Sequence, residues 1–172
     1  MTSKEFLNGL THGKSDVLQF LIDILTDEGI DYCVIGGLAV NAYVEPVVSL
    51  DLNIVVALSG IEALMRRVVE RFDVKKFEHS INLYSPDSDI RIQIQTDEGY
   101  LPFLDGAEER RVLGYAMRVA SLKDVLQGKI RAYCDEDRRR SKRQKDLADI
   151  FRIVESFPEL ESMLPPVVRD RM

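Results

Sequence analysis

The fold is best predicted from the segment 32-YCVIGGLAVNAYVEPVVSLDLNIVV-56. One apolar run in it ends at a glycine pair, and a second contains two polar residues, Asp51 and Asn53. Residues 49–58 read as a strand, and side chains of a strand alternate between its two faces. Asp51 and Asn53 therefore share one face, and the aliphatic residues between them face the core. Oxygen-bearing side chains at one end of a strand are ligands that Mg²⁺ takes in proteins. The alternative is a strand end whose polar residues face water.

The glycine pair lies upstream of this strand. Residues 31–37 form a short apolar run that ends at Gly36 and Gly37, and residues 38–45 are compatible with a short helix closed by Pro46. Such a turn lets the backbone approach a phosphate closely, with helix N-terminal amides directed at it. A glycine pair alone more often marks only a tight turn. Followed about fourteen residues later by Asp-x-Asn on a strand, it is a more specific indication of a phosphate site.

The remaining elements alternate between helix and strand periodicity. Hydrophobic spacing predicts helices over 15–29, 61–72, 121–133 and about 138–155. Residues 81–85 and 90–95 alternate and flank the turn-forming 86-PDSD-89, which predicts a hairpin; residues 111–119 predict one or two strands interrupted at Gly114. The tail 164–172 is expected to be irregular. The sum is an α+β domain, with a core over 1–120 and a C-terminal helical part over 121–172 packed on it as one compact unit.

Composition excludes several classes of protein. The 172 residues are 45% hydrophobic, no apolar run is long enough to span a membrane, and the N-terminus lacks a signal-peptide core, so a cytoplasmic protein is expected. The two cysteines and two histidines show no metal-binding spacing, which argues against zinc. The net charge of −6 argues against a protein that coats nucleic acid.

One segment reverses that charge. In 138-RRRSKRQK-145 six of the eight residues are basic. On a helix Arg138, Lys142 and Lys145 fall near one face, and Arg139 and Arg143 near another. One interpretation is a positively charged surface that binds a triphosphate or an RNA acceptor. The other is a solvated helix whose charges offset nearby acidic residues. The pattern leaves both open.

Together these motifs resemble the nucleotidyltransferase (polymerase-β-like) superfamily, and within it the small bacterial AbiEii-like group of toxin–antitoxin systems. The first motif of that superfamily is a hydrophobic strand, a glycine pair, a short helix and an Asp-x-Asp strand, which residues 32–56 follow. The C-terminal segments 121-SLKDVLQGKIRAY-133 and 138-RRRSKRQKDLADI-150 are similar to its lysine-bearing helix and its Lys-Asp helix. The resemblance implies the nucleotidyltransferase fold, a mixed β-sheet flanked by helices.

The resemblance also implies roles for individual residues. Asp51, Asp146 and Lys129 would be catalytic. Gly36, Gly37, Ser49 and Lys145 would contact the nucleotide. Asp51 would bind Mg²⁺, with weaker help from Asn53, and Gln93 would occupy the position of a third carboxylate.

The sequence departs from the superfamily pattern where the metal ligands belong. Asn53 replaces the second aspartate, Val47 stands where an arginine precedes the serine, and Gln93 and Gln95 occupy the strand that would supply the third carboxylate. Asp97 is the nearest acidic replacement. Because affinity for a divalent cation follows the charge of its ligands, a conventional two-metal site is not expected.

Three functions follow as hypotheses. The first is an enzyme that binds NTP and Mg²⁺ and transfers a nucleotidyl group to an unknown acceptor, such as an RNA or a protein. The second is a non-catalytic member, a pseudoenzyme, that binds nucleotide or RNA. The third is a toxin–antitoxin-type protein that acts by binding a cognate partner protein.

Overall fold

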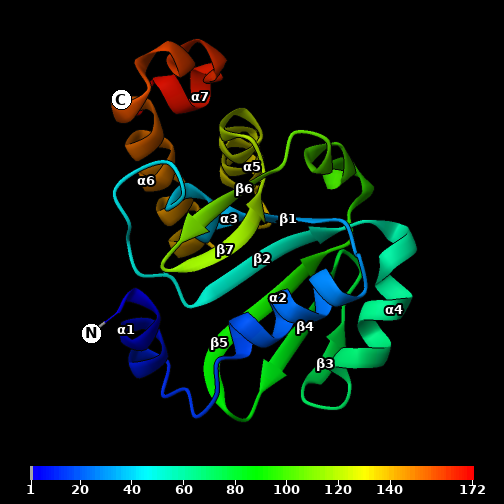
Figure 1. The fold of residues 1–172 in the computed structure, drawn as a ribbon. Helices are drawn as coiled ribbons and strands as arrows, with labels where there is room; N and C mark the ends of the chain where they lie inside the picture. The colour runs from blue at the N-terminus through cyan, green and yellow to red at the C-terminus, as the bar shows by residue number, and fades with distance from the viewer. Residues whose placement is uncertain (1) are drawn as a thin grey trace.

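A seven-stranded mixed sheet forms the centre of the protein, for which the computed structural model describes residues 2–172. Its strands lie in the order β3-β4-β5-β2-β1-β7-β6 (Figure 1). β2 pairs in parallel with β5 and β1 in parallel with β7, while the other neighbours are antiparallel. The strands are β1 (Tyr32–Ile35), β2 (Asp51–Val56), β3 (Asp73–Lys76), β4 (Ser80–Ser85), β5 (Ser88–Gln95), β6 (Glu108–Val112) and β7 (Tyr115–Val119).

Helices flank this sheet, as expected. They are α1 (Ser3–Leu10), α2 (Val17–Asp27), α3 (Gly36–Val40), α4 (Leu58–Val68), α5 (Leu122–Cys134), α6 (Arg140–Ser156) and α7 (Pro166–Arg169), with 3₁₀ turns η1 (Glu98–Leu104) and η2 (Pro158–Met163). In Figure 1, α2 crosses in front of the sheet, and α5 and α6 stand together at the end where β6 and β7 lie. α5 and α6 pack on each other, and both contact α3.

The alternation read from the sequence is confirmed in β2 and β5. Leu52, Ile54, Ile92 and Ile94 are buried in the core that also contains α2 and α4, while their polar neighbours are less buried. Parallel register places Asn53 opposite Gln93. The hairpin of β4 and β5 and the interruption at Gly114, which separates β6 from β7, are also confirmed.

The expected helix at 38–45 is shifted. α3 begins at Gly36 and ends at Val40. Asn41 then ties the following loop in place, because its side chain donates to the Val47 carbonyl at 2.7 Å and accepts from the Val47 amide at 3.0 Å. The loop that leads to β2 is therefore anchored next to α3.

Other elements were missed or misjudged. The tail was expected to be irregular, but residues 166–169 form α7, which Pro166 initiates and Val168 anchors in the core. β3, α1 and η1 were not predicted. β3 is an edge strand of mostly exposed residues and α1 buries only Leu7, so neither element contributes much to the core.

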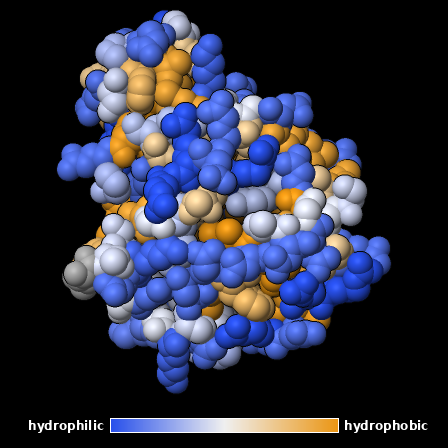
Figure 2. Space-filling model, in the orientation of Figure 1, coloured by the Kyte–Doolittle hydropathy of each residue, from blue (hydrophilic) through white to orange (hydrophobic). Residues whose placement is uncertain are grey.

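The surface is mainly polar. Figure 2 shows hydrophilic residues over most of the visible face, with a hydrophobic area over the C-terminal helices at the upper end. Within residues 2–172, none of the helices combines the length and apolar character needed to cross a bilayer.

Candidate functional site

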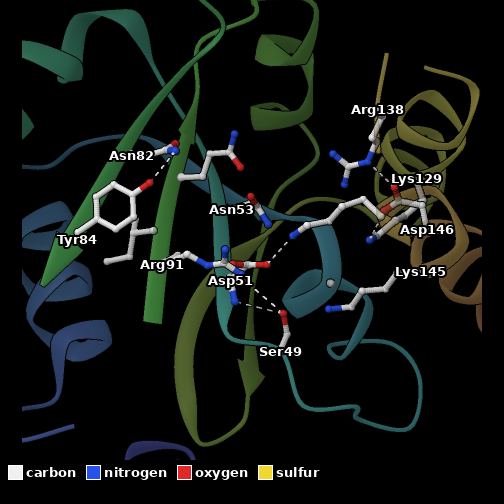
Figure 3. Close-up of a pocket in the computed structure, with 14 residues that line it drawn as sticks. Ser49, Asp51, Asn53, Asn82, Tyr84, Arg91, Lys129, Arg138, Lys145 and Asp146 are labelled. Carbon is white, nitrogen blue, oxygen red and sulfur yellow. Dashed lines mark hydrogen bonds and ion pairs between the residues drawn. The ribbon is translucent and has the colours of Figure 1, made fainter. Parts of the chain in front are cut away.

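A cleft of about 210 Å³ opens beside the ends of β2, β5 and β4 and under α6. It brings together the predicted residues Gly37, Ser49, Asp51, Asn53, Gln93, Lys129, Lys145 and Asp146 (Figure 3). Only Gly36, of the predicted set, lies outside this lining, and it lines an adjoining cavity that shares Asn53 with the cleft. The structure therefore brings these distant segments together at one cleft, whereas the chemical roles of their residues stay predictions.

The glycine pair lies where a side chain would crowd residues of the cleft, with Gly37 in its lining and Gly36 in that of the adjoining cavity. Gly36 has φ +72°, a backbone conformation that side chains of L-residues rarely adopt. A Cβ at Gly36 would come within 2.9 Å of Asn53 Nδ2, and one at Gly37 would lie 3.4 Å from Ser49 Oγ. α3 is only five residues long, so the turn offers close backbone approach rather than a strong helix dipole.

Asp51 is held by two cations. Arg91 Nε lies 2.8 Å from Asp51 Oδ1, and Lys142 Nζ donates to Asp51 Oδ2 at 3.3 Å. Arg91 comes from β5 and Lys142 from α6, so the carboxylate joins sheet and helix. Beside it, Ser49 Oγ lies 3.3 Å from the Asp51 carbonyl, to which it donates.

Asp146 is also held by two cations, in a more buried setting. Lys129 Nζ donates to Asp146 Oδ1 at 3.0 Å, and Arg138 Nε donates to Oδ2 at 2.6 Å. Lys129 also lies 2.8 Å from Asp149 Oδ2, and Asp149 pairs with Arg152. The side chains of Lys129, Asp146 and Asp149 are at most 8% exposed, so this network ties α5 to α6.

The basic run begins before α6 and continues into it. Lys142 and Lys145 line the cleft from one helical face, as the spacing predicted, and Arg138 lines it from the turn that precedes the helix. Arg143 turns away and donates to the Tyr133 carbonyl at 2.7 Å. In Figure 3, Lys145 extends toward the side of the cleft where Ser49 lies.

Positive charge dominates the cleft as a result. Five cationic side chains and two carboxylates line it, an excess of three positive charges in a protein whose net charge is −6. Counting Asp149 behind Lys129 leaves an excess of two. Such a cleft attracts a polyanion.

A second cavity of about 120 Å³ adjoins the first and has a different character. The two share Asn53, Gln93, Lys129, Arg138 and Asp146. The second adds the rings of Tyr100 and Phe103, which meet edge to face with centroids 5.2 Å apart. Its wall also includes Val125 and Gly128 of α5. An anion-attracting space therefore opens next to an aromatic one.

Sequence reasoning did not assign a role to several residues of the cleft. Arg91 was assigned no role, although alternation along β5 places it on the same strand face as Gln93. Asn82 and Tyr84 of β4 were not singled out, although β4 pairs with β5 and their side chains lie in the cleft. Alternation along β4 was the available signal, but it does not tell which face borders a cavity.

The donor set does not fit a two-metal centre. Asp51 and Asp146 are the carboxylates of the cleft, and each already faces two cations. Asn53 and Gln93 contribute neutral amides. Asp97, the nearest candidate for a replacement, instead caps η1 by accepting from the Gly99 amide at 2.8 Å. Across residues 2–172, no group of three His, Cys, Asp or Glu side chains is arranged to hold a metal ion.

Comparison with known proteins rests on structure. No family model and no curated protein sequence matches the chain. Among solved structures, ANT(2″)-Ia in complex with adenylyl-2″-tobramycin matches with a TM-score of 0.65 at 13% identity, over 90% of this chain and 96% of that one. The lincomycin-bound lincosamide antibiotic adenylyltransferase LnuA matches with a TM-score of 0.56 at 11% identity, over 83% of this chain and 99% of that one.

A third similar structure is an antigenic nucleotidyltransferase-like protein from Paracoccidioides brasiliensis. Its TM-score is 0.55 at 18% identity, over 81% of this chain and 74% of that one. The AbiEii-like placement stays a prediction. The architecture expected from residues 32–56 and 121–150 is confirmed, and the protein has the fold of the nucleotidyltransferase superfamily.

Proposed function

We propose that the protein binds a nucleoside triphosphate in this cleft, with the triphosphate among the cations and the nucleoside toward the aromatic cavity. The observation that carries the proposal is the excess of positive charge beside the Gly37 turn. Lys145 and Lys142 supply ammonium point charges, and Arg138 offers a planar donor group at the boundary of the two cavities. Gly37 lets a phosphate approach the backbone closely, and Ser49 beside it supplies a hydroxyl group.

In this proposal the acidic residues organise the cations. Asp51 holds Arg91 and Lys142 in place, and Asp146 does the same for Lys129 and Arg138. Lys129 is buried and shared between two carboxylates, so it positions Asp146 rather than contacting the ligand with a free charge. The cations face the cleft already oriented, which lowers the entropy cost of binding.

Isothermal titration calorimetry with ATP, CTP, GTP and UTP tests the proposal. We expect binding of at least one NTP, weakened about tenfold in Lys145→Met because a charge-assisted contact is lost. Arg140→Met is the matched control, since Arg140 is exposed and lies outside the cleft lining. Absence of heat with all four nucleotides, or equal loss in both variants, would contradict the proposal.

Transfer of the nucleotidyl group to a small acceptor is a second candidate. It is favoured by the two adjoining cavities, which offer room for two ligand parts, and by similar structures described as an adenylyltransferase and as a complex with adenylyl-2″-tobramycin. Transfer of labelled nucleotide, compared between wild type and Asp51→Ala, tests it. Equal labelling would exclude a catalytic role for Asp51. RNA or protein acceptors and a cognate partner protein stay predictions.

A further inference from the structure

We infer that the cleft takes its polyphosphate ligand as the metal-free anion, with Arg91 and Lys142 neutralising the charge that Mg²⁺ would otherwise neutralise. This inference rests on the proposed nucleotide binding and deepens it. The ligand class is a linear polyphosphate, free or as part of a nucleotide.

The first argument is the state of Asp51. A hard divalent cation needs oxygen ligands with unshared negative charge. Both Asp51 oxygens face cations, Oδ1 an Arg91 nitrogen at 2.8 Å and Oδ2 the Lys142 ammonium at 3.3 Å. A metal bound at Asp51 would have to displace these groups or lie close to their positive charge, and either costs free energy.

The second argument concerns the neighbours of Asp51. Asn53 lies opposite Gln93 across the parallel strand pair, so the positions next to Asp51 present two neutral amides. Each amide offers one carbonyl oxygen and an NH₂ group that donates hydrogen bonds. Phosphate oxygens accept such bonds, whereas a metal ion receives only neutral carbonyl oxygens from these positions. The face of β2 and β5 that carries Asn53 and Gln93 therefore favours an anion over a metal ion.

The third argument is the total charge. The excess of three positive charges in the lining complements a triphosphate that carries its full negative charge. A bound Mg²⁺ removes two of those negative charges before the ligand arrives. The attraction to the cleft is then smaller, and one cationic side chain remains without a counter-charge.

Calorimetry with and without the metal tests this inference. ATP and inorganic tripolyphosphate are titrated into the full chain, once in EDTA and once in saturating MgCl₂, and MgCl₂ is also titrated alone. We expect both ligands to bind about tenfold more tightly in EDTA, and Mg²⁺ alone to produce no binding heat. Tighter binding of ATP than of tripolyphosphate would support a nucleotide as the ligand, and equal binding a free polyphosphate; both outcomes support the inference.

The variants Arg91→Gln and Lys142→Met sharpen the test. Each should weaken metal-free ATP about tenfold and reduce the difference between EDTA and Mg²⁺. Arg66→Gln is the matched control, because Arg66 is an exposed residue of α4 that pairs with Glu62 outside the cleft. Thermal unfolding of each variant verifies that it is folded.

Two results would overturn the inference, and they have different consequences. If Mg²⁺ tightens ATP binding, metal-free recognition is wrong while the proposed nucleotide binding stands. If ATP binds neither in EDTA nor in Mg²⁺, the proposed function fails and this inference fails with it.

Discussion

Arg91 lies opposite Asp51 in the parallel pairing of β2 and β5, and its Nε is 2.8 Å from the Asp51 carboxylate (Figure 3). The strand position that the superfamily resemblance assigns to a metal ligand is therefore occupied by an ion pair. The pair belongs to the cation-rich lining of the cleft, which also contains Lys142. This relationship changes the expected ligand from a metal-bound nucleotide to a free polyanion.

Lys129 should matter for stability. Lys129→Met leaves Asp146 and Asp149 buried with one cation each, and loss of a buried ionic partner costs about 3 kcal/mol of unfolding free energy. Urea denaturation measures the loss. The control Lys123→Met changes an exposed residue of the same helix and should alter stability by less than about 0.5 kcal/mol. Equal stability of the two variants would show that the network is not stabilising.

Gly36 should matter for both stability and ligand binding. Gly36→Ala forces a side chain into a left-handed conformation, at a cost of about 1 kcal/mol, and also pushes against Asn53 in the cleft. Gly29→Ala is the matched control, since Gly29 has φ +61° and open space around its Cβ position. We expect both variants to lose stability in urea titrations, but only Gly36→Ala to lose ATP affinity in calorimetry. Unchanged affinity in Gly36→Ala would mean that the turn does not shape the site.

Asn53→Asp should alter the preference for the metal. A second carboxylate beside Asp51 lowers the positive excess by one charge and restores part of the donor set that Mg²⁺ needs. Metal-free ATP should then bind about tenfold more weakly, and the penalty for adding Mg²⁺ should shrink or reverse. Gln127→Glu makes the same change of charge at an exposed position of α5 and should leave both affinities unchanged. If Asn53→Asp behaves like this control, Asn53 does not face the ligand.

The two cysteines should differ in reactivity. Burial raises the pKa of the Cys33 thiol to about 12, while Cys134 is exposed at the end of α5. Because only the thiolate reacts and reagent must reach it, iodoacetamide at pH 8 should modify Cys134 alone in the native protein. Mass spectrometry should detect a second adduct only after unfolding, and none on native Cys134→Ser. Rapid native modification of Cys33 would contradict the buried position of β1.

Local sequence patterns predicted the facing of the core strands, and the resemblance to the superfamily named most of the residues that line the cleft. Alternation in 49–58 and 90–95 fixed which residues face the interior, because a strand has only two faces. Helical spacing separated Lys142 and Lys145 from Arg143, since a helix returns to the same face after three or four residues, whereas Arg138 lies in the turn before α6 and reaches the cleft from there. These are local properties of the chain.

Which charged residues of the site pair with one another follows from the tertiary structure alone. The pairing of Asp51 with Arg91 depends on the register of two strands that are distant in sequence, and its pairing with Lys142 depends on where α6 docks. The same docking buries Lys129 between two carboxylates of α6. Charges interact according to distance and burial, and neither is encoded in local periodicity. The positive charge of the cleft therefore arises only when α5 and α6 pack together and bring their cations next to Arg91 of β5.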